Sequence, residues 1–403
     1  MTGQQTTQPY RKEINDMTFK WPLINDNITA EDKNALIDFL KIPNVRLTQG
    51  ERVREFEKKW SEWLGVKHSV FVNSGASANY ITMAITRELK GQQGEVIVPP
   101  IGWVSDVASV INTGLTPVFV DVDKSNMSIA YENIKNAITE ETKAIVLVHC
   151  LGFNGLNEKI IQLALTHNLL LIEDCCESHG AIFKEDRVGS WGDMSCFSFY
   201  FGHHITTIEG GMVCTDNYEI YQLAKLFRSH GMTREVSQET HDHYYEEGLN
   251  PMFTFGVPGY NMRSTELNAV LGLQQMHRLD FNIDCRKENL AVWLDNLDSE
   301  KYFTAFDTKG NSNFALPLIL AKPDAMALSN ICNFLETEGV EYRLGTAGGG
   351  NQARQPYLKK YSFRQADDLA NADYIHENSL YIGNHTELSK EQIVALCRGL
   401  NDV

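Results

Sequence analysis

Apolar side chains recur at helical spacing in the first part of the chain. Residues 27–31 supply a cap and an acidic first turn before an apolar run that ends at Leu40. A second stretch, residues 53–64, repeats apolar residues at intervals of three and four positions and stops at Gly65. Both stretches predict amphipathic helices.

From residue 66 the pattern changes to short apolar runs, rich in β-branched residues, with helical stretches such as 78–89 and 158–167 between them. The runs that predict strands are Ser69 to Val72, Glu95 to Val98, Val118 to Val120, Ala144 to Val148 and Leu169 to Ile172. This alternation indicates an α/β fold with a mostly parallel sheet covered on both faces. Ligands of such sheets bind beyond the carboxyl ends of the strands.

Two further strands are predicted at residues 196–200 and 212–215, on either side of a polar turn that holds His203 and His204. The polar and acidic residues 235–250 that follow predict a surface loop.

A second unit is predicted in the last part of the chain. A long helical pattern runs from Thr265 to Leu279 and leads into it. Its own predicted elements are a strand at residues 313–320 and helices at residues 325–338 and 389–400. We therefore expect an N-terminal segment and a large domain over residues 1–275, and a smaller α+β domain over residues 276–403.

Charge and cysteine content narrow the classes of function. The 403-residue chain has 36 Lys and Arg against 52 Asp and Glu, a net charge of -16 that repels nucleic acid and acidic membranes. The eight cysteines show no zinc-binding spacing, so we expect buried free thiols and no metal site. The leader from Met1 to Met17 is polar, and no stretch approaches the length of a membrane span. We expect a cytoplasmic protein without a nucleic-acid or membrane partner.

Three segments at predicted strand ends carry candidate chemistry. Residues 73–79 form a small-residue turn before a helix, where backbone amides can hold a phosphate; a plain tight turn is the alternative. Asp174 ends a buried strand, where a carboxylate can meet the protonated ring nitrogen of a ligand; a helix cap is the alternative. The third segment, residues 195–211, contains both histidines.

Taken in this order, the three segments resemble the sugar-modifying branch of the fold type I pyridoxal 5'-phosphate (PLP) enzymes, the family of nucleotide-sugar aminotransferases. The resemblance covers nearly the whole chain and includes motifs at residues 46–57, 99–103 and 259–263. It implies an aspartate aminotransferase-like fold, with a large PLP-binding domain and a smaller C-terminal α+β domain.

One position departs from the aminotransferase pattern. The aminotransferases keep a Schiff-base lysine in a segment shaped like S-F-x-x-x-K-x-I-T-T-x-E-G-G, and this chain has His203 there. Histidine cannot form a stable imine, but it can move a proton near neutral pH. The exchange resembles the 3-dehydratases of deoxysugar biosynthesis that act on GDP-4-keto-6-deoxymannose, and residues 383–385 add to this likeness. A CDP-sugar relative carries a C-x-C pair for an iron–sulfur cluster, which this sequence lacks.

The resemblance also implies how the cofactor is held. Asp174 would pair with the pyridinium nitrogen, Trp103 would stack on the ring, and Glu177 would approach the ring hydroxyl. The phosphate would be held by the amides of Gly75 and Ala76, by Ser198, and by Asn261 from a second subunit. Close relatives place a hydroxyl residue at position 76, so only the amide contact carries over. These roles imply a homodimer with shared active sites.

The implied reaction starts from PLP and L-glutamate, which together give pyridoxamine 5'-phosphate (PMP). Its amine condenses with the C4 ketone of a GDP-4-keto-6-deoxy sugar, His203 removes a proton, and the C3 hydroxyl leaves. Hydrolysis then gives ammonia and a 4-keto-3,6-dideoxy sugar for surface polysaccharide. His230, Arg234 and Arg343 would handle glutamate or the sugar, with surface arginine as the alternative for the last two.

Several alternatives stay open. A nucleotide-sugar 4-aminotransferase is disfavoured because no lysine stands at position 203. The same elimination could act on a 6-deoxyheptose or on a sugar with another nucleotide. A non-catalytic PLP-binding protein would keep the cofactor residues without turnover. If the segment is shifted by one residue, His204 becomes the base in place of His203.

Overall fold

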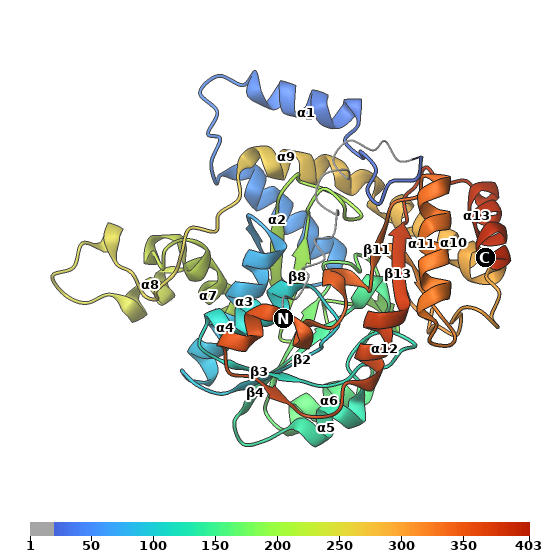
Figure 1. Ribbon diagram of the computed structural model, residues 1–403. Helices are drawn as coiled ribbons and strands as arrows, with labels where there is room; N and C mark the ends of the chain where they lie inside the picture. The colour runs from blue at the N-terminus through green and yellow to red at the C-terminus, as the bar shows by residue number, and fades with distance from the viewer. Residues whose placement is uncertain (1–19) are drawn as a thin grey trace, which may run out of the picture.

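An eight-stranded sheet forms the centre of the molecule in the computed structural model, which describes residues 20–403 (Figure 1). The polar leader, Met1 to Met17, lies outside these residues. The strand order is β1-β9-β8-β5-β4-β2-β3-β12. The bounds are β1 (His68–Val72), β2 (Glu95–Val98), β3 (Thr116–Phe119), β4 (Thr142–Val148), β5 (Leu170–Asp174), β8 (Met194–Ser198), β9 (Gly211–Thr215) and β12 (Arg364–Gln365). Only β9 runs antiparallel to its neighbours, so the predicted mostly parallel sheet is confirmed.

Helices cover both faces of this sheet, as the alternating pattern predicts. In Figure 1, α3 (Gly75–Lys90) and α4 (Val104–Asn112) lie on one side, and α5 (Tyr131–Ala137) and α6 (Glu158–Thr166) lie on the other. The chain passes from β2 through α4 to β3, whereas it passes from β4 through α6 to β5 in the opposite direction. A crevice opens where two such paths diverge at the carboxyl ends of parallel strands.

The two N-terminal helices are also confirmed. They are α1 (Ala30–Leu40) and α2 (Glu51–Leu64), and both pack on α9 (Glu266–Gln275). From α2, the buried Phe56 and Trp60 insert into the core, with ring centroids 4.9 Å from Phe71 and 4.8 Å from Phe199, respectively. Aromatic pairs at such distances stabilise a core beyond their burial alone, so these contacts hold α2 against the sheet.

The C-terminal part forms a three-stranded antiparallel sheet with its own helices. Its strands are β10 (Ala315–Ile319), β13 (Ser379–Gly383) and β11 (Tyr342–Leu344), and its helices are α10 (Leu279–Asn296), α11 (Ala325–Glu338), α12 (Ala370–Asn378) and α13 (Lys390–Asp402). The strand and the two helices predicted here are confirmed, while β11 and β13 were not predicted. The short β12 leaves this part of the chain and pairs parallel with β3 of the large sheet.

Two local predictions need correction. The loop predicted over residues 235–250 contains a helix, α8 (Gln238–Tyr244), which buries none of its side chains and lies after α7 (Tyr218–Arg228). The helical pattern from Thr265 to Leu279 is broken by a 3₁₀ turn at Met276–Arg278. A small hairpin, β6 (Ile182–Phe183) and β7 (Asp186–Arg187), completes the strands. Between residues 20 and 403, no helix is both long and apolar enough to cross a membrane.

Candidate active site

A cavity of about 520 Å³ opens at the carboxyl ends of β4, β5 and β8. Its volume lies within the range of small-molecule binding sites. The predicted site residues that line it are Gly75, Ala76, Trp103, Asp174, Glu177, Ser198, His203 and Arg343. The fold therefore brings together residues from the turn after β1, the end of β5, the end of β8 and the C-terminal unit.

One end of this cavity has the geometry of an anion site. Helix α3 begins at Gly75, and Ser74 caps it by accepting a hydrogen bond from the amide of Ser77 at 3.0 Å. The amides of Gly75 and Ala76 lead the helix, where amides have no partner inside the helix and the helix dipole favours negative charge. A Cβ at position 75 would lie 2.6 Å from the Cβ of Ser198, so the glycine lets the end of β8 approach the turn.

The other end of the cavity is acidic. Asp174 ends β5 and is buried; its Oδ1 accepts a hydrogen bond from the amide of Cys176 at 2.9 Å, and its Oδ2 accepts one from Asn79 Nδ2 at 2.8 Å. No helix begins after Asp174, since β5 is followed by the β6–β7 hairpin and β8, so the helix-cap alternative is wrong. The carboxylate is instead held at the cavity wall by two donors.

Two further acids lie beside Asp174. Burial raises the pKa of Glu177 to about 7; the amide of Leu151, which donates to its Oε2 at 2.7 Å, lowers this pKa, and the charge of Asp174 raises it. Burial and then the charge of Asp174 raise the pKa of Asp106 well above its usual range. A ligand with a phosphate at one end and a cationic ring nitrogen at the other fits these two ends of the cavity, and PLP has both.

Trp103 and Arg343 form part of the cavity wall. Trp103 precedes α4, and 57% of its side chain is exposed, which is unusual for a tryptophan and leaves its face free for a ring. Arg343 lies on β11, where its guanidinium pairs with Glu341 at 2.8 Å. Its half-exposed side chain therefore already has an acidic neighbour.

Two buried histidines, His149 and His203, line this cavity, and the Nδ1 of His203 has no hydrogen-bond partner. The pKa of His203 is lowered to about 4, chiefly by burial and then by the charge of Arg286, while the charge of Asp174 acts in the opposite direction. The ring is therefore neutral near pH 7. His204 is fully buried, does not line this cavity, and its Nε2 lies 3.1 Å from the hydroxyl of Ser312. This geometry favours His203 over His204 as the base.

Three predicted residues lie elsewhere. His230 and Asn261 are exposed side chains on two adjacent segments, where the amide of His230 donates to the carbonyl of Tyr260 at 2.8 Å. Arg234 lines a second cavity, of about 570 Å³. The basic residues of that cavity are Arg46, Arg54, Lys225, Arg228, Arg234 and Arg263. The roles predicted for these three residues stay predictions.

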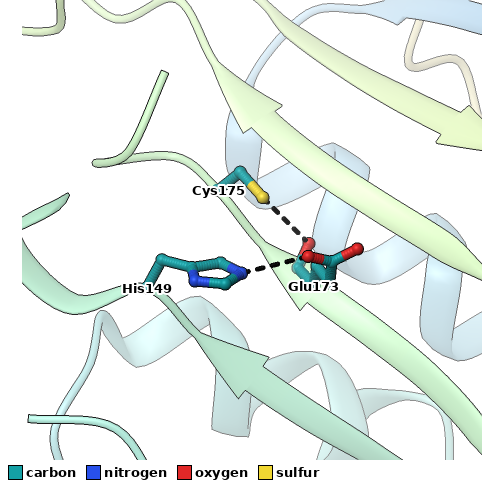
Figure 2. A group of neighbouring side chains, drawn as sticks. All are labelled: His149, Glu173 and Cys175. Carbon is teal, nitrogen blue, oxygen red and sulfur yellow. Dashed lines mark hydrogen bonds and ion pairs between the residues drawn. The ribbon is translucent and has the colours of Figure 1, made fainter. Parts of the chain in front are cut away.

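Sequence reasoning missed a polar group formed by His149, which lines the cavity, and by the buried Glu173 and Cys175 (Figure 2). His149 Nδ1 accepts from the amide of Gly155 at 3.1 Å, so its Nε2 donates to Glu173 Oε2 at 3.2 Å. The Glu173 carboxylate also accepts hydrogen bonds from three backbone amides, those of Gly189, Trp191 and Gly192. These bonds use the ligand atoms of His149 and Glu173, so the group resembles a structural network more than an ion site.

Known proteins share this fold and sequence. GDP-4-keto-6-deoxy-D-mannose 3-dehydratase from Yersinia pseudotuberculosis is 32% identical over 381 residues, which cover 93% of this chain and 96% of that protein. The solved E. coli GDP-4-keto-6-deoxy-D-mannose-3-dehydratase with bound hydrated PLP has a TM-score of 0.89 and 29% identity, over 95% of this chain and 100% of that chain. A structure of GDP-4-keto-6-deoxymannose-3-dehydratase with a trapped PLP-glutamate geminal diamine has a TM-score of 0.88 and 29% identity, over 94% and 100%.

These structures confirm the predicted fold class. The sequence pattern of the DegT/DnrJ/EryC1/StrS aminotransferase family matches residues 26–401, which is nearly all of the chain. The likeness therefore extends from the N-terminal helices to the last helix, as the motifs predicted. The chain belongs to the DegT/DnrJ/EryC1/StrS aminotransferase family.

Proposed function

We propose that this protein is a PLP- and glutamate-dependent 3-dehydratase of a GDP-4-keto-6-deoxy sugar, acting in polysaccharide biosynthesis. The observation that carries the proposal is His203: a buried, neutral histidine with a free nitrogen, in the segment where the aminotransferases keep a lysine. Relatives of this chain bear the name of that activity. We also propose a cytoplasmic location, which is consistent with a biosynthetic enzyme.

The cavity residues divide the work of holding the cofactor. The amides of Gly75 and Ala76 and the hydroxyl of Ser198 would hold the phosphate, and Asp174 would hold the ring N–H. Trp103 would cover one face of the ring. When bound, the cofactor supplies an electron sink and, after glutamate has reacted, an amine for the C4 ketone of the sugar.

His203 would move the proton. Because its Nδ1 is enclosed, the other ring nitrogen, Nε2, is the atom that can accept a proton from the cavity side. The same nitrogen could then protonate the leaving C3 hydroxyl, which departs as water. A histidine that stays neutral above a pKa of about 4 is in the form that accepts this proton at neutral pH.

We also propose a homodimer in which Asn261 of one subunit completes the site of the other. Asn261 and His230 are exposed and do not line their own cavity. Large apolar side chains are exposed near them: Tyr260 by 61% and Phe255 by 55%. Exposed aromatic groups of this kind mark interaction surfaces.

Subunit mixing tests the shared site. The variants His203→Asn and Asn261→Ala, each expected to be inactive alone, are purified separately and then mixed. In a mixed dimer, one of the two sites then has both residues intact. A statistical mixture should regain about a quarter of wild-type activity, since half of the dimers are mixed and each has one intact site. No recovery would place Asn261 in the site of its own chain, against the proposal.

The division of the chain into two domains near residue 275 remains a proposal. Helix α9 ends at Gln275, and the 3₁₀ turn at Met276–Arg278 separates it from α10. A fragment of residues 276–403, if it forms a domain, should show the helical signal of α11 and α13 by circular dichroism. An unfolded fragment would place the boundary elsewhere.

The function is tested with purified protein, PLP, glutamate and GDP-4-keto-6-deoxymannose, read by mass spectrometry and by an ammonia assay. We expect a sugar that has lost one oxygen, with ammonia formed. A sugar that has gained an amine in place of its keto oxygen would support the aminotransferase alternative instead. Turnover only with a heptose or another nucleotide would keep the elimination and change the substrate, and PLP binding without any turnover would favour a non-catalytic protein.

A further inference from the structure

Two buried carboxyl groups in the cavity share one amide nitrogen. Asn79 Nδ2, on α3, lies 2.9 Å from Asp106 Oδ1 on α4 and 2.8 Å from Asp174 Oδ2 at the end of β5. The same nitrogen lies 3.1 Å from the hydroxyl of Ser105. Asp106 is 4% exposed and Asp174 is 6% exposed, and Asp106 Oδ2 is enclosed with no hydrogen-bond partner. Three elements therefore meet at one nearly buried polar contact in the cavity wall.

The groups around this pair add no positive charge. Between residues 20 and 403, no Lys, Arg or His forms an ion pair with either carboxyl group. The titratable neighbours of Asp106 are Asp174 at the end of β5, Glu177 after it, Cys150 after β4, Cys176 and Cys196 near the strand ends, and Tyr357 from the C-terminal part. Two buried carboxylates this close cannot both ionise without a large electrostatic cost, so one of them keeps a proton.

Hydrogen bonding decides which of the two carries it. Asp174 accepts bonds from Asn79 and from the amide of Cys176, and both bonds stabilise its charged form. Asp106 Oδ1 accepts the Asn79 bond, and its Oδ2 has no hydrogen-bond partner. Burial, followed by the charge of Asp174, raises the pKa of Asp106 well above its usual range, although the backbone of Trp103 acts in the opposite direction.

We propose, on the basis of the proposed function, that Asp106 is a positioning residue for the cofactor. Its carboxyl group keeps a proton at neutral pH, which leaves Asp174 as the single anion that faces the ring nitrogen. Together with Asn79, the protonated Asp106 fixes the orientation of the Asp174 carboxylate. A second charge at this place would instead be buried without a partner.

Infrared spectroscopy of the full chain, free of PLP, tests the proton directly. At about pH 8, above the pKa of Glu177, the wild-type protein should show the carbonyl band of a protonated carboxyl group that shifts in heavy water. Asp106→Asn should remove this band, while Ser105→Ala and Glu177→Gln should keep it. Absence of the band in wild type, or its persistence in Asp106→Asn, would overturn the proposal.

The affinity for PLP tests the positioning role. Asparagine is neutral, has the shape of protonated aspartic acid and can donate to Asp174, so Asp106→Asn should bind PLP within about threefold of wild type. Asp106→Leu fills a similar volume without hydrogen bonds and should bind about tenfold more weakly. Equal affinity for Asp106→Leu and wild type would contradict the role, and circular dichroism checks the fold of both variants. If wild type binds no PLP, the proposed function fails and this role with it, whereas the infrared result still identifies the buried proton.

Discussion

His149 and His203 are both buried at the carboxyl edge of the sheet, but their polar contacts differ. His149 uses both ring nitrogens, since Nδ1 accepts from Gly155 and Nε2 donates to Glu173. His203 has an Nδ1 without a partner, although both histidines line the cavity. A buried polar group whose bonds are complete holds the wall, whereas one with bonds left over pays for its burial without stabilising the fold. At His203 the ring with the unpaired nitrogen also lines the cavity, where a ligand can meet it.

The largest effect is expected at His203. His203→Asn removes the group that carries the proton but keeps a smaller polar side chain. Proton transfer by a positioned side chain contributes about 10²- to 10⁴-fold to the rate of a reaction. We expect kcat for sugar deoxygenation to fall by about 10³-fold, with PLP affinity within about threefold of wild type. Steady-state kinetics and a PLP titration measure the two quantities.

His204→Asn is the matched control for this variant, because it removes the neighbouring histidine. His204 does not line the cavity and contacts Ser312, so kcat should change by less than about tenfold per folded molecule. A reversed result, with His204→Asn the inactive variant, would show that the segment is shifted by one residue and would break the comparison between His149 and His203.

The next effect is expected at the partner of His149. Glu173→Gln keeps the shape of the side chain but replaces one carboxylate oxygen by an NH₂ group. In the wild-type protein both oxygens accept hydrogen bonds from backbone amides, so in the variant the NH₂ group faces another donor. The free energy of unfolding should fall by about 3 kcal/mol, since a buried donor is left without an acceptor and the bond to His149 is weakened. Urea unfolding measures this loss.

Glu158→Gln makes the same chemical change on the surface. Glu158 is largely exposed and pairs with Lys184, so this control should alter the free energy of unfolding by less than about 0.5 kcal/mol. If both variants lose the same small amount, the network around Glu173 is not what holds this wall.

Much of the cavity could be predicted because strand ends leave clear patterns. Asp174 and Ser198 follow apolar runs, and parallel strands bring their carboxyl ends to one edge, so the sequence order implies their proximity. Asp106 left no such signal: it stands inside the apolar helix α4, and nothing local shows that Asn79 and Asp174 surround it. Contacts between elements distant in sequence require the fold.

Other residues escaped prediction for different reasons. Helix α8 buries none of its side chains, so its sequence has no apolar periodicity to mark it. The role predicted for Asn261 involves a second subunit, and the role predicted for His230 involves glutamate or the sugar, so neither rests on a contact within this chain's own cavity. His149 directly follows Val148, the last residue of β4, which pairs with Asp174 at the end of β5, and this position at a strand end was the signal that could have identified it.

The smallest effect, taken per pH unit, concerns the dependence of stability on pH. The pKa of His203 is lowered to about 4 in the folded protein, chiefly by burial, against an ordinary value near 6.5 in the unfolded chain. Between these two values the unfolded chain binds a proton that the folded protein does not. The free energy of unfolding therefore falls as pH falls through this window, by about 1.4 kcal/mol per pH unit for this one group.

His203→Gln removes the group and should make this dependence shallower by that amount, measured by urea unfolding at several pH values between about 6.5 and 4. His277→Gln, at an exposed histidine, should leave the slope of wild type unchanged because its ring stays in solvent in both states. Equal slopes for His203→Gln and wild type would mean that His203 accepts a proton in the folded protein as easily as in the unfolded chain. The contrast with the fully bonded His149 would then lose its physical basis. Water would reach the imidazole of His203 and form a hydrogen bond to Nδ1, so that this nitrogen would not lack a partner.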